Sequence, residues 1–523
     1  MNKFLMTILL CAGSIAYGQD FDLTWGAVSK ASSSDAVYAP LGWYNGFYYT
    51  LKVDNGNGYL LKADNSLTLK AQPELITGQK KFNAELAMFR NGQLLILASE
   101  YEKDQQATIV QAWIFKEDGK PTSTKMKTVA KFPVEKSREA EDVSYRLSAD
   151  SSLILISMDH NMPNKEDAKF SLAVIGADDL KKVWETQATV PYADTDFSLL
   201  STAVDRSGNA IALGVIRGGD GKRLAAYSTR AFVFNTASEK YDDRELKIDN
   251  KYISSAFIQF TAENQLMISG FYNGLTAKGK NEGIEGAFIA STTVDNLASL
   301  DLKVMAISPT TKAAITPTSS FAKWIGADEL NAYNIRNINM RPDGSGYVIA
   351  EQRFMVRSVD GNTETRSYYF NHIIAYSFDA AQNIEWISSV PKEQVTSMSA
   401  PVLGIGPVAI YTWTNAMTRM AFKYNSYQQV EINNTIYLLY NDHRDNGDAR
   451  SMKECKTMSN KKNANGVIVA IGPDGKWEKT TLFAGKEVDV ILESSSCLPI
   501  PGVGFTISAE KGKDLQLGTL TLR

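Results

Sequence analysis

Acidic side chains recur at one position of a repeated sequence unit. In each unit a short polar turn precedes a run of apolar residues. In six units a carboxylate stands at the end of that run, and these residues are Asp54, Glu100, Asp159, Glu351, Asp442 and Glu510. A ring of carboxylates at equivalent strand ends suits a cation, an amine or a basic partner. The alternative interpretation is that solvated strand ends need polar residues of any kind.

Histidine is scarce, and its spacing does not predict a metal site. The chain has three histidines, and none has a second ligand at the short spacing that zinc sites use. His443 directly follows Asp442, so acid–base chemistry, if present, would rest on His443 or on Asp159, Glu351 and Asp442. Oxygen ligands do not alternate between Asp442 and Asp448 as a calcium loop requires. We therefore expect no cofactor, apart from incidental calcium on a loop.

Cations stand beside two of these carboxylates. Arg353 follows Glu351 by two positions, and Arg444 opens a basic segment that extends to Asn465. A charged cluster of both signs can bind a ligand without catalysing a reaction. The predicted binding residues are Asp54, Glu100, Asp159, Glu351, Arg353, Asp442 and Arg444.

Two cysteines remain after the N-terminal segment. Cys455 lies in the basic segment, and Cys497 lies at the start of a strand in the next unit. Cysteines in an oxidising compartment tend to pair. The sequence therefore predicts a Cys455–Cys497 disulfide, and the alternative is two separate buried thiols.

The elements that must position these residues are short strands. Turns such as Asn45-Gly46 and Asn91-Gly92 precede apolar runs, which is the pattern of a β-hairpin. Further strands follow each hairpin, so each unit is predicted to contain four antiparallel strands. Such units, repeated radially, form a β-propeller. We expect an all-β fold with a single propeller of about eight blades, seven being the alternative. A row of β-sandwich domains is the rival fold, but no linker divides the chain.

The two ends of the chain predict how the ring closes. The last unit ends after its third strand, Leu515–Leu522, and Phe21–Val28 is a strand-like run without a partner. Pairing these segments would close the ring and cover an open edge. Before them, Lys3, the apolar run Phe4–Ala16 and the small residue Gly18 have the pattern of a signal peptide. We therefore expect residues 1–18 to be a signal peptide and residues 19–523 to form the propeller domain of an exported, periplasmic or secreted protein.

The connections between strands predict two different faces. The turns between first and second strands are short, whereas the connections at the other end are long. These long connections are Asp159–Lys169, Gly218–Ala225, Asn273–Gly283, Gln352–Arg366 and Asp442–Asn465, with Ser308–Asn337 and Glu393–Tyr424 between units. Long connections in compact domains are usually functional or disordered. The tryptophans that open three fourth strands, Trp184, Trp386 and Trp477, are predicted to pack between sheets.

The chain resembles secreted or periplasmic bacterial β-propeller proteins of uncharacterised function. The resemblance rests on the signal-peptide pattern, the loosely spaced repeat of a turn followed by a strand, and the missing strand of the last unit. The resemblance implies fold and location and transfers no catalytic residue. The net charge of −3 argues against a nucleic-acid partner, and no later apolar run is long enough to span a membrane. We predict an exported binding or scaffold propeller that docks a protein or a glycan through its long-loop face. The alternatives are a hydrolase or lyase acting on polysaccharide or peptide, and a structural envelope component.

Overall fold

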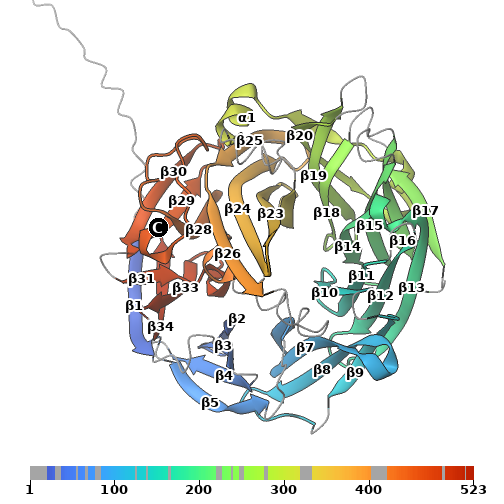
Figure 1. The fold of residues 1–523 in the computed structure, drawn as a ribbon, viewed down its shortest axis with the longest axis horizontal. Helices are drawn as coiled ribbons and strands as arrows, with labels where there is room; N and C mark the ends of the chain where they lie inside the picture. The colour runs from blue at the N-terminus through green and yellow to red at the C-terminus, as the bar shows by residue number, and fades with distance from the viewer. Residues whose placement is uncertain are drawn as a thin grey trace, which may run out of the picture.

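The computed structural model is an eight-bladed β-propeller (Figure 1). It describes residues 21–29, 37–54, 57–64, 67, 69–76, 84–123, 126–136, 139–162, 166–218, 226–236, 240–246, 252–275, 281–317, 332–401, 421–485, 489–512 and 514–523. The predicted signal peptide, residues 1–18, lies outside this part of the chain. No helix among the described residues is long and apolar enough to cross a membrane.

Each blade is an antiparallel sheet whose strands follow one another from the centre of the ring outward. Blade 1 consists of β2 (Val37–Tyr44), β3 (Phe47–Asp54), β4 (Asn57–Ala63) and β5 (Leu69–Ile76). Blade 2 consists of β6 (Leu86–Arg90), β7 (Gln93–Glu102), β8 (Ala107–Lys116) and β9 (Lys127–Pro133). Blade 3 consists of β10 (Ala140–Leu147), β11 (Leu153–His160), β12 (Asp167–Gly176) and β13 (Lys182–Ala193). Blade 4 consists of β14 (Phe197–Val204), β15 (Ala210–Gly218), β16 (Ala226–Phe234) and β17 (Tyr241–Leu246).

The second half of the ring has the same order with two additions. Blade 5 consists of β18 (Tyr252–Phe260), β19 (Leu266–Leu275), β20 (Asn281–Thr292) and β21 (Lys303–Ala306). Blade 6 consists of β22 (Tyr333–Met340), β23 (Gly346–Asp360), β24 (Thr363–Phe378), β25 (Ile384–Val390) and the additional β26 (Gln394–Pro401). Blade 7 consists of β27 (Tyr427–Ile432), β28 (Thr435–His443), β29 (Ala464–Ile471) and β30 (Trp477–Ala484). Blade 8 consists of the short β31 (Val490–Leu492) and β32 (Leu498–Ile500), then β33 (Gly504–Lys511), β34 (Asp514–Leu522) and β1 (Phe21–Ser29). The helix α1 (Pro309–Ile315) follows blade 5.

The tight turns predicted from Asn-Gly pairs are present. Asn45 and Gly46 have φ of 48° and 78°, and Asn91 and Gly92 have φ of 48° and 74°. Both central residues of each turn are therefore left-handed, as in the type I′ turns that match the twist of antiparallel strands. Glycine and asparagine tolerate this conformation best, which is why the pattern identified the hairpins correctly.

The predicted closure of the ring is confirmed. Strand β1 pairs antiparallel with β34, with Phe21 opposite Leu522 and Leu23 opposite Leu520. The first described strand therefore becomes the outer strand of the last blade, as Figure 1 shows. This pairing supplies hydrogen-bond partners to a strand that would otherwise present an open edge.

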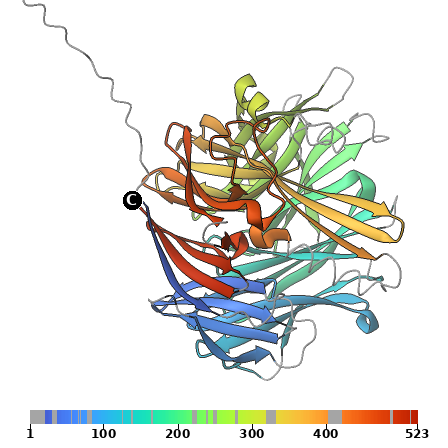
Figure 2. The ribbon, with the colours of Figure 1, turned by 60° about the vertical axis from the view of Figure 1, so that its left-hand side comes forward.

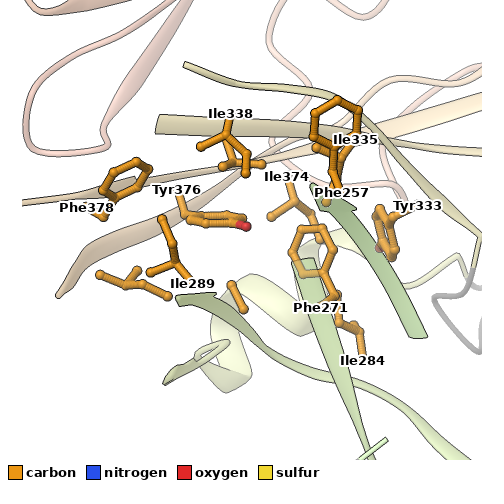
Figure 3. Close-up of a cluster of buried hydrophobic side chains, with 14 of the residues drawn as sticks. Phe257, Phe271, Ile284, Ile289, Tyr333, Ile335, Ile338, Ile374, Tyr376 and Phe378 are labelled. Carbon is orange, nitrogen blue, oxygen red and sulfur yellow. The ribbon is translucent and has the colours of Figure 1, made fainter. Parts of the chain in front are cut away.

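The core lies between neighbouring blades. The cluster in Figure 3 joins blades 5 and 6, with Phe271 and Ile289 on one side and Tyr376 on the other. Tryptophans on fourth strands reach the next blade, as predicted. Trp184 Nε1 donates to the carbonyl oxygen of Gly208 at 2.7 Å, and Trp386 Nε1 donates to that of Pro473 at 2.8 Å. These contacts pack blade against blade rather than forming a ligand platform.

The two faces of the ring differ, and one predicted loop is wrong. We call the end with the turns between first and second strands the tight-turn face, and the opposite end the long-loop face. Gln352–Arg366 was expected to be a loop on the latter, but it is mostly strand, because β23 and β24 continue to a turn after Asp360. Strand β26 pairs with the same outer half of β24. Residues 353–370 and 394–401 thus form a three-stranded sheet, the arm, which projects from the ring (Figure 2).

Candidate functional site

A buried charged cluster lies at the root of the arm. Glu351 is fully buried, and its Oε1 lies 2.7 Å from Nζ of Lys392, which is also fully buried. Its Oε2 lies 2.5 Å from Nε of Arg353 and accepts a hydrogen bond from Ser426 Oγ at 2.7 Å. Lys392 occupies the break between β25 and β26, and Ser426 precedes blade 7. One carboxylate therefore ties the arm to its own blade and to the next one.

The cluster contains more cations than carboxylates. Arg336, on the innermost strand β22, donates to Ser426 Oγ at 2.5 Å and to the carbonyl oxygen of Tyr427 at 2.9 Å. Burial alone would raise the pKa of Glu351, but Lys392, Arg353 and Arg336 lower it to about 2. Glu351 is therefore ionised at neutral pH, which does not suit it to act as a general acid.

A neutral histidine lies beside this cluster. His372 Nε2 and Tyr333 Oη are 2.6 Å apart, and both side chains are buried. Burial, with a smaller effect of Lys392, lowers the pKa of His372 to about 3. The imidazole is therefore neutral at physiological pH. Its Nδ1 has no hydrogen-bond partner among the described residues.

The basic loop between β28 and β29 is held by an ion pair. Asp442 Oδ2 lies 2.7 Å from Nζ of Lys479, and both side chains are almost fully buried. Asn446 donates to Asp442 Oδ1 at 2.8 Å, and Lys479 donates to the carbonyl oxygen of Asn446 at 3.1 Å. At its far end the loop meets the arm, where Met458 N donates to the carbonyl oxygen of Glu393 at 2.8 Å. Val395 N of the arm donates in turn to the carbonyl oxygen of Met458 at 3.0 Å, so the loop and the root of the arm are hydrogen-bonded to each other.

A charged pocket opens beside this loop, between blades 7 and 8. Its volume is about 490 Å³, and Arg444, Lys461, Lys462, Asp489 and Glu510 are among its lining residues. Lys461 Nζ lies 2.8 Å from Oε1 of Glu510, whereas the nearest carboxylate to Arg444 is 3.8 Å away, on the neighbouring Asp445. Pockets of a few hundred Å³ accommodate small ligands. The predicted binding residue Arg444 therefore lies at a concave site.

Of the other predicted site residues, only His443 contacts one of these clusters, because its backbone N–H donates to Asp442 Oδ1 at 2.9 Å. Asp54 ends β3, and its side chain lies outside the described part of the structure. Glu100 is exposed on β7. Asp159 accepts a hydrogen bond from the backbone of His160 at 3.0 Å. The Nδ1 atom of His443 accepts one from the backbone of Asp445 at 3.2 Å. Residues predicted as one acidic ring thus have separate surroundings, and Glu351, Asp442 and Glu510 are each paired with lysine or arginine.

The predicted disulfide is wrong. Cys455 and Cys497 are both free thiols. Cys497 is fully buried, where its Sγ accepts a hydrogen bond from Ser508 N and donates toward the backbone oxygens of blade 8. The basic loop is fixed instead by Asp442 and Lys479, so it needs no covalent link. No group of metal-ligating residues is found within the described residues.

A second cavity lies on the tight-turn face. It measures about 830 Å³ and is lined by the tight-turn ends of β10, β14, β18 and β22. Arg146, Arg336 and Arg341 line it. The sequence analysis missed these residues because it compared the ends of second strands, whereas the cavity is formed by first strands. Arg146 is the seventh residue of β10 and Arg336 the fourth of β22, so no shared strand position indicated them.

The solved structures to which this chain is similar resemble it only weakly. No family model and no curated protein matches the chain. The WD40 domain of SCAP from fission yeast is 6% identical, with a TM-score of 0.34, and the match covers 96% of this chain and 94% of that one. The β-propeller domain of the trilobed protease from Pyrococcus furiosus is 9% identical, with a TM-score of 0.31 and coverage of 73% and 97%. The α-L-arabinofuranosidase Arb93A from Fusarium graminearum is 11% identical, with a TM-score of 0.31 and coverage of 63% and 92%. At this similarity no activity transfers, and the resemblance to exported bacterial propeller proteins stays a prediction.

Proposed function

We propose that this protein is an exported binding propeller that docks a protein or a glycan through its long-loop face. The arm is the observation that carries the proposal. It extends beyond the ring as a three-stranded sheet, and its side chains Met355 and Val359 are 46% and 56% exposed. Large apolar side chains gathered on a projecting element are typical of interaction surfaces.

The buried cluster supports binding rather than catalysis. A docking element must hold its orientation, and Glu351, Lys392 and Arg353 fix the arm at its root. The catalytic alternative needs a carboxylate with an adjustable protonation state. Glu351 and Asp442 are instead held in ion pairs with lysines that are as buried as they are. Their arrangement suits a rigid support.

Export is part of the same proposal. The pattern of Lys3 and the apolar run Phe4–Ala16 predicts secretion into the periplasm or the medium. Cleavage before Gln19 would release a chain that begins two residues before β1. N-terminal sequencing of the protein from the medium or the periplasm tests this, and an uncleaved cytoplasmic chain would contradict it.

Paired arm variants test the docking. Met355→Asp and Val359→Asp place charge on the exposed arm without changing a buried side chain. The control is Val304→Asp on β21, because Val304 is 47% exposed but belongs to the outer strand of blade 5. Immobilised protein is exposed to envelope extracts and to a panel of envelope polysaccharides, and the same ligand is quantified for each variant. Loss of that ligand with both arm variants but not with the control is expected.

The same panel separates the alternatives. Equal capture by the arm variants and the wild-type protein would refute the arm as the docking element. Release of soluble fragments from a polysaccharide or peptide, lost in Asp159→Asn, would favour the hydrolase or lyase instead. A protein that captures nothing yet is needed for envelope integrity would favour the structural alternative.

A further inference from the structure

The cavity on the tight-turn face is a second concave site, distinct from the proposed docking face. Four consecutive blades contribute to it, each through the end of its innermost strand or the turn that follows. Its volume of about 830 Å³ lies within the range of small-molecule sites. The arm extends β23 and β24 from the opposite face of the ring, and Arg336 is the residue that the cavity shares with the cluster at the root of the arm.

Two arginines in this cavity lack a directly bonded carboxylate among the described residues. Arg146 on β10 packs over the ring of Phe257, with 5.2 Å between its guanidinium carbon and the ring centre. Arg336 on β22 bonds only neutral acceptors, Ser426 Oγ and the carbonyl oxygen of Tyr427. Burial lowers the pKa of both arginines, because the surrounding ring replaces part of their hydration. Cations in such surroundings are stabilised by a bound anion.

The remaining charges of the cavity are already matched or lie at its rim. Arg341 Nε is 2.6 Å from Oε1 of Glu431. Asp343 accepts hydrogen bonds from the backbone and the hydroxyl of Ser345 at 2.9 and 2.7 Å, within the turn after β22. Glu263 belongs to the turn after β18 and is exposed. Arg336 shares the charge of Glu351 with Lys392 and Arg353, and Arg146 has no carboxylate bonded to it among the described residues, so the cavity carries excess positive charge on its strands.

Strand β22 is irregular at Arg336, which lines the cavity. The register of β22 and β23 shifts between Ile335 and Ile338, so the strand bulges at Arg336. A bulge turns a side chain away from the regular alternation and is common next to functional sites. Ile335 and Ile338 on either side stay buried in the core cluster of Figure 3. The bulge is thus anchored by packing at both ends.

The cavity also offers apolar surface. Leu147, at the end of β10, is 41% exposed, although it is a large apolar side chain. Met340 and Phe257 line the same cavity, and Phe257 is held in the core cluster. An apolar wall next to two guanidinium groups matches a molecule with a hydrophobic body and an anionic end.

We propose that this cavity binds a small organic anion. Its carboxylate or phosphate accepts hydrogen bonds from Arg146 and Arg336, and its carbon skeleton packs on Leu147, Phe257 and Met340. A guanidinium presents a planar fork of donors that fits either oxyanion. The shared recognition chemistry is therefore an oxyanion on an apolar body, and the probes below distinguish its two sources.

Three matched probes test the proposal. Benzoate, phenyl phosphate and benzyl alcohol share an aromatic ring and differ in the charged group. Saturation-transfer NMR at constant ionic strength gives an affinity for each with the purified protein. We expect at least one anion to bind at concentrations up to about 10 mM, and benzyl alcohol to bind about tenfold more weakly or not at all. The tighter of the two anions identifies the oxyanion that the site prefers.

Variants locate the binding. Arg146→Gln should weaken the anion about tenfold or more, because a hydrogen bond to a charged group is lost. Leu147→Asp places a carboxylate in the cavity at an already exposed position and should weaken the anion without harming the fold. Arg357→Gln, on the arm, is the control and should bind as the wild type does. Equal affinities for all three probes, no anion binding, or anion binding unchanged by Arg146→Gln and Leu147→Asp would overturn the proposal.

Discussion

Replacing Glu351 with glutamine should destabilise the protein, because it removes the carboxylate with which Lys392 and Arg353 are paired. The substitution Glu351→Gln keeps the volume of the side chain and leaves Lys392, Arg353 and Arg336 without their counter-charge. The pKa of Glu351 falls from 4.5 to about 2 on folding. At about 1.4 kcal/mol per pKa unit, this difference stabilises the folded protein by about 3 kcal/mol at neutral pH. Breaking a buried ion pair typically costs about 3–5 kcal/mol.

The pH dependence of this effect has a defined sign. The folded-state pKa of Glu351 is depressed, so its stabilisation is complete above about 4.5, the unfolded value, and is lost as the pH falls toward about 2. Urea unfolding of the wild-type and Glu351→Gln proteins should therefore show a gap of about 3 kcal/mol at neutral pH. The gap should shrink steadily below the unfolded pKa.

Two further variants make the reasoning refutable. Adding Lys392→Met to Glu351→Gln removes one uncompensated cation, so the double variant should be more stable than Glu351→Gln alone. The control is Asp178→Asn, which breaks the exposed ion pair with Arg90 and should leave the free energy of unfolding nearly unchanged. A Glu351→Gln protein as stable as the wild type at neutral pH, or a gap that does not change with acid, would refute the electrostatic account.

Three other outcomes follow from the fold. Gly475 has φ of 77°, and an added Cβ would lie 2.7 Å from the ring of Trp386. The control is Gly46→Ala, because Gly46 has φ of 78° and nothing within 4 Å of the added Cβ. Gly475→Ala should therefore lower the free energy of unfolding by about 1–3 kcal/mol more than Gly46→Ala does. Equal losses of stability would exclude the clash with Trp386. Deleting Phe21–Ser29 uncovers the edge of β34 and should cost at least about 3 kcal/mol and promote aggregation, and light scattering with urea unfolding checks both. The two cysteines of the native protein should react slowly with a thiol reagent at neutral pH, because burial raises the pKa of each thiol to about 12. After unfolding, the reagent should detect two thiols. Detecting none would show that the two cysteines form a disulfide.

The sequence predicts the ring well because its repeats are local. Asn45-Gly46 and similar turns act within a few residues, and each identifies one hairpin. Counting these hairpins gives eight blades, and the unpaired segment Phe21–Val28 predicts the closing strand that β1 supplies. Both features depend on the pattern of one short segment, without knowledge of its distant neighbours.

The arm shows where a local pattern was read too strictly. The polar residues after Glu351 were taken as the end of a strand. Strand β23 nevertheless continues to Asp360, where Asp360-Gly361 is itself a hairpin signal. Its outward half leaves the core, but it still carries Phe354, Met355, Val356 and Val359, so β-forming residues there did indicate a longer strand. The partner β26 comes from the connection after blade 6, and pairing across such a distance has no local signature.

The clusters could not be predicted because each joins residues from separate blades. Glu351 meets Lys392 across a sheet and Ser426 across a blade boundary. Cys455 was paired with Cys497 from compartment and loop position alone, but a disulfide also needs a close approach of the two backbones. Arg146 and Arg336 converge only when the ring is closed, because they lie on first strands of different blades.

The long-loop face and the tight-turn face differ in how their buried charges are paired. On the long-loop face, the buried carboxylates Glu351 and Asp442 meet cations within about 3 Å of their oxygens, which fixes the arm and the basic loop as rigid surfaces. On the tight-turn face, Arg146 has no directly bonded carboxylate among the described residues, Arg336 shares Glu351 with two other cations, and both arginines line a cavity. Pairing these arginines with carboxylates, or replacing them with apolar side chains, would increase the stability of the fold. An anion bound in the cavity of about 830 Å³ would supply the charge that these arginines lack.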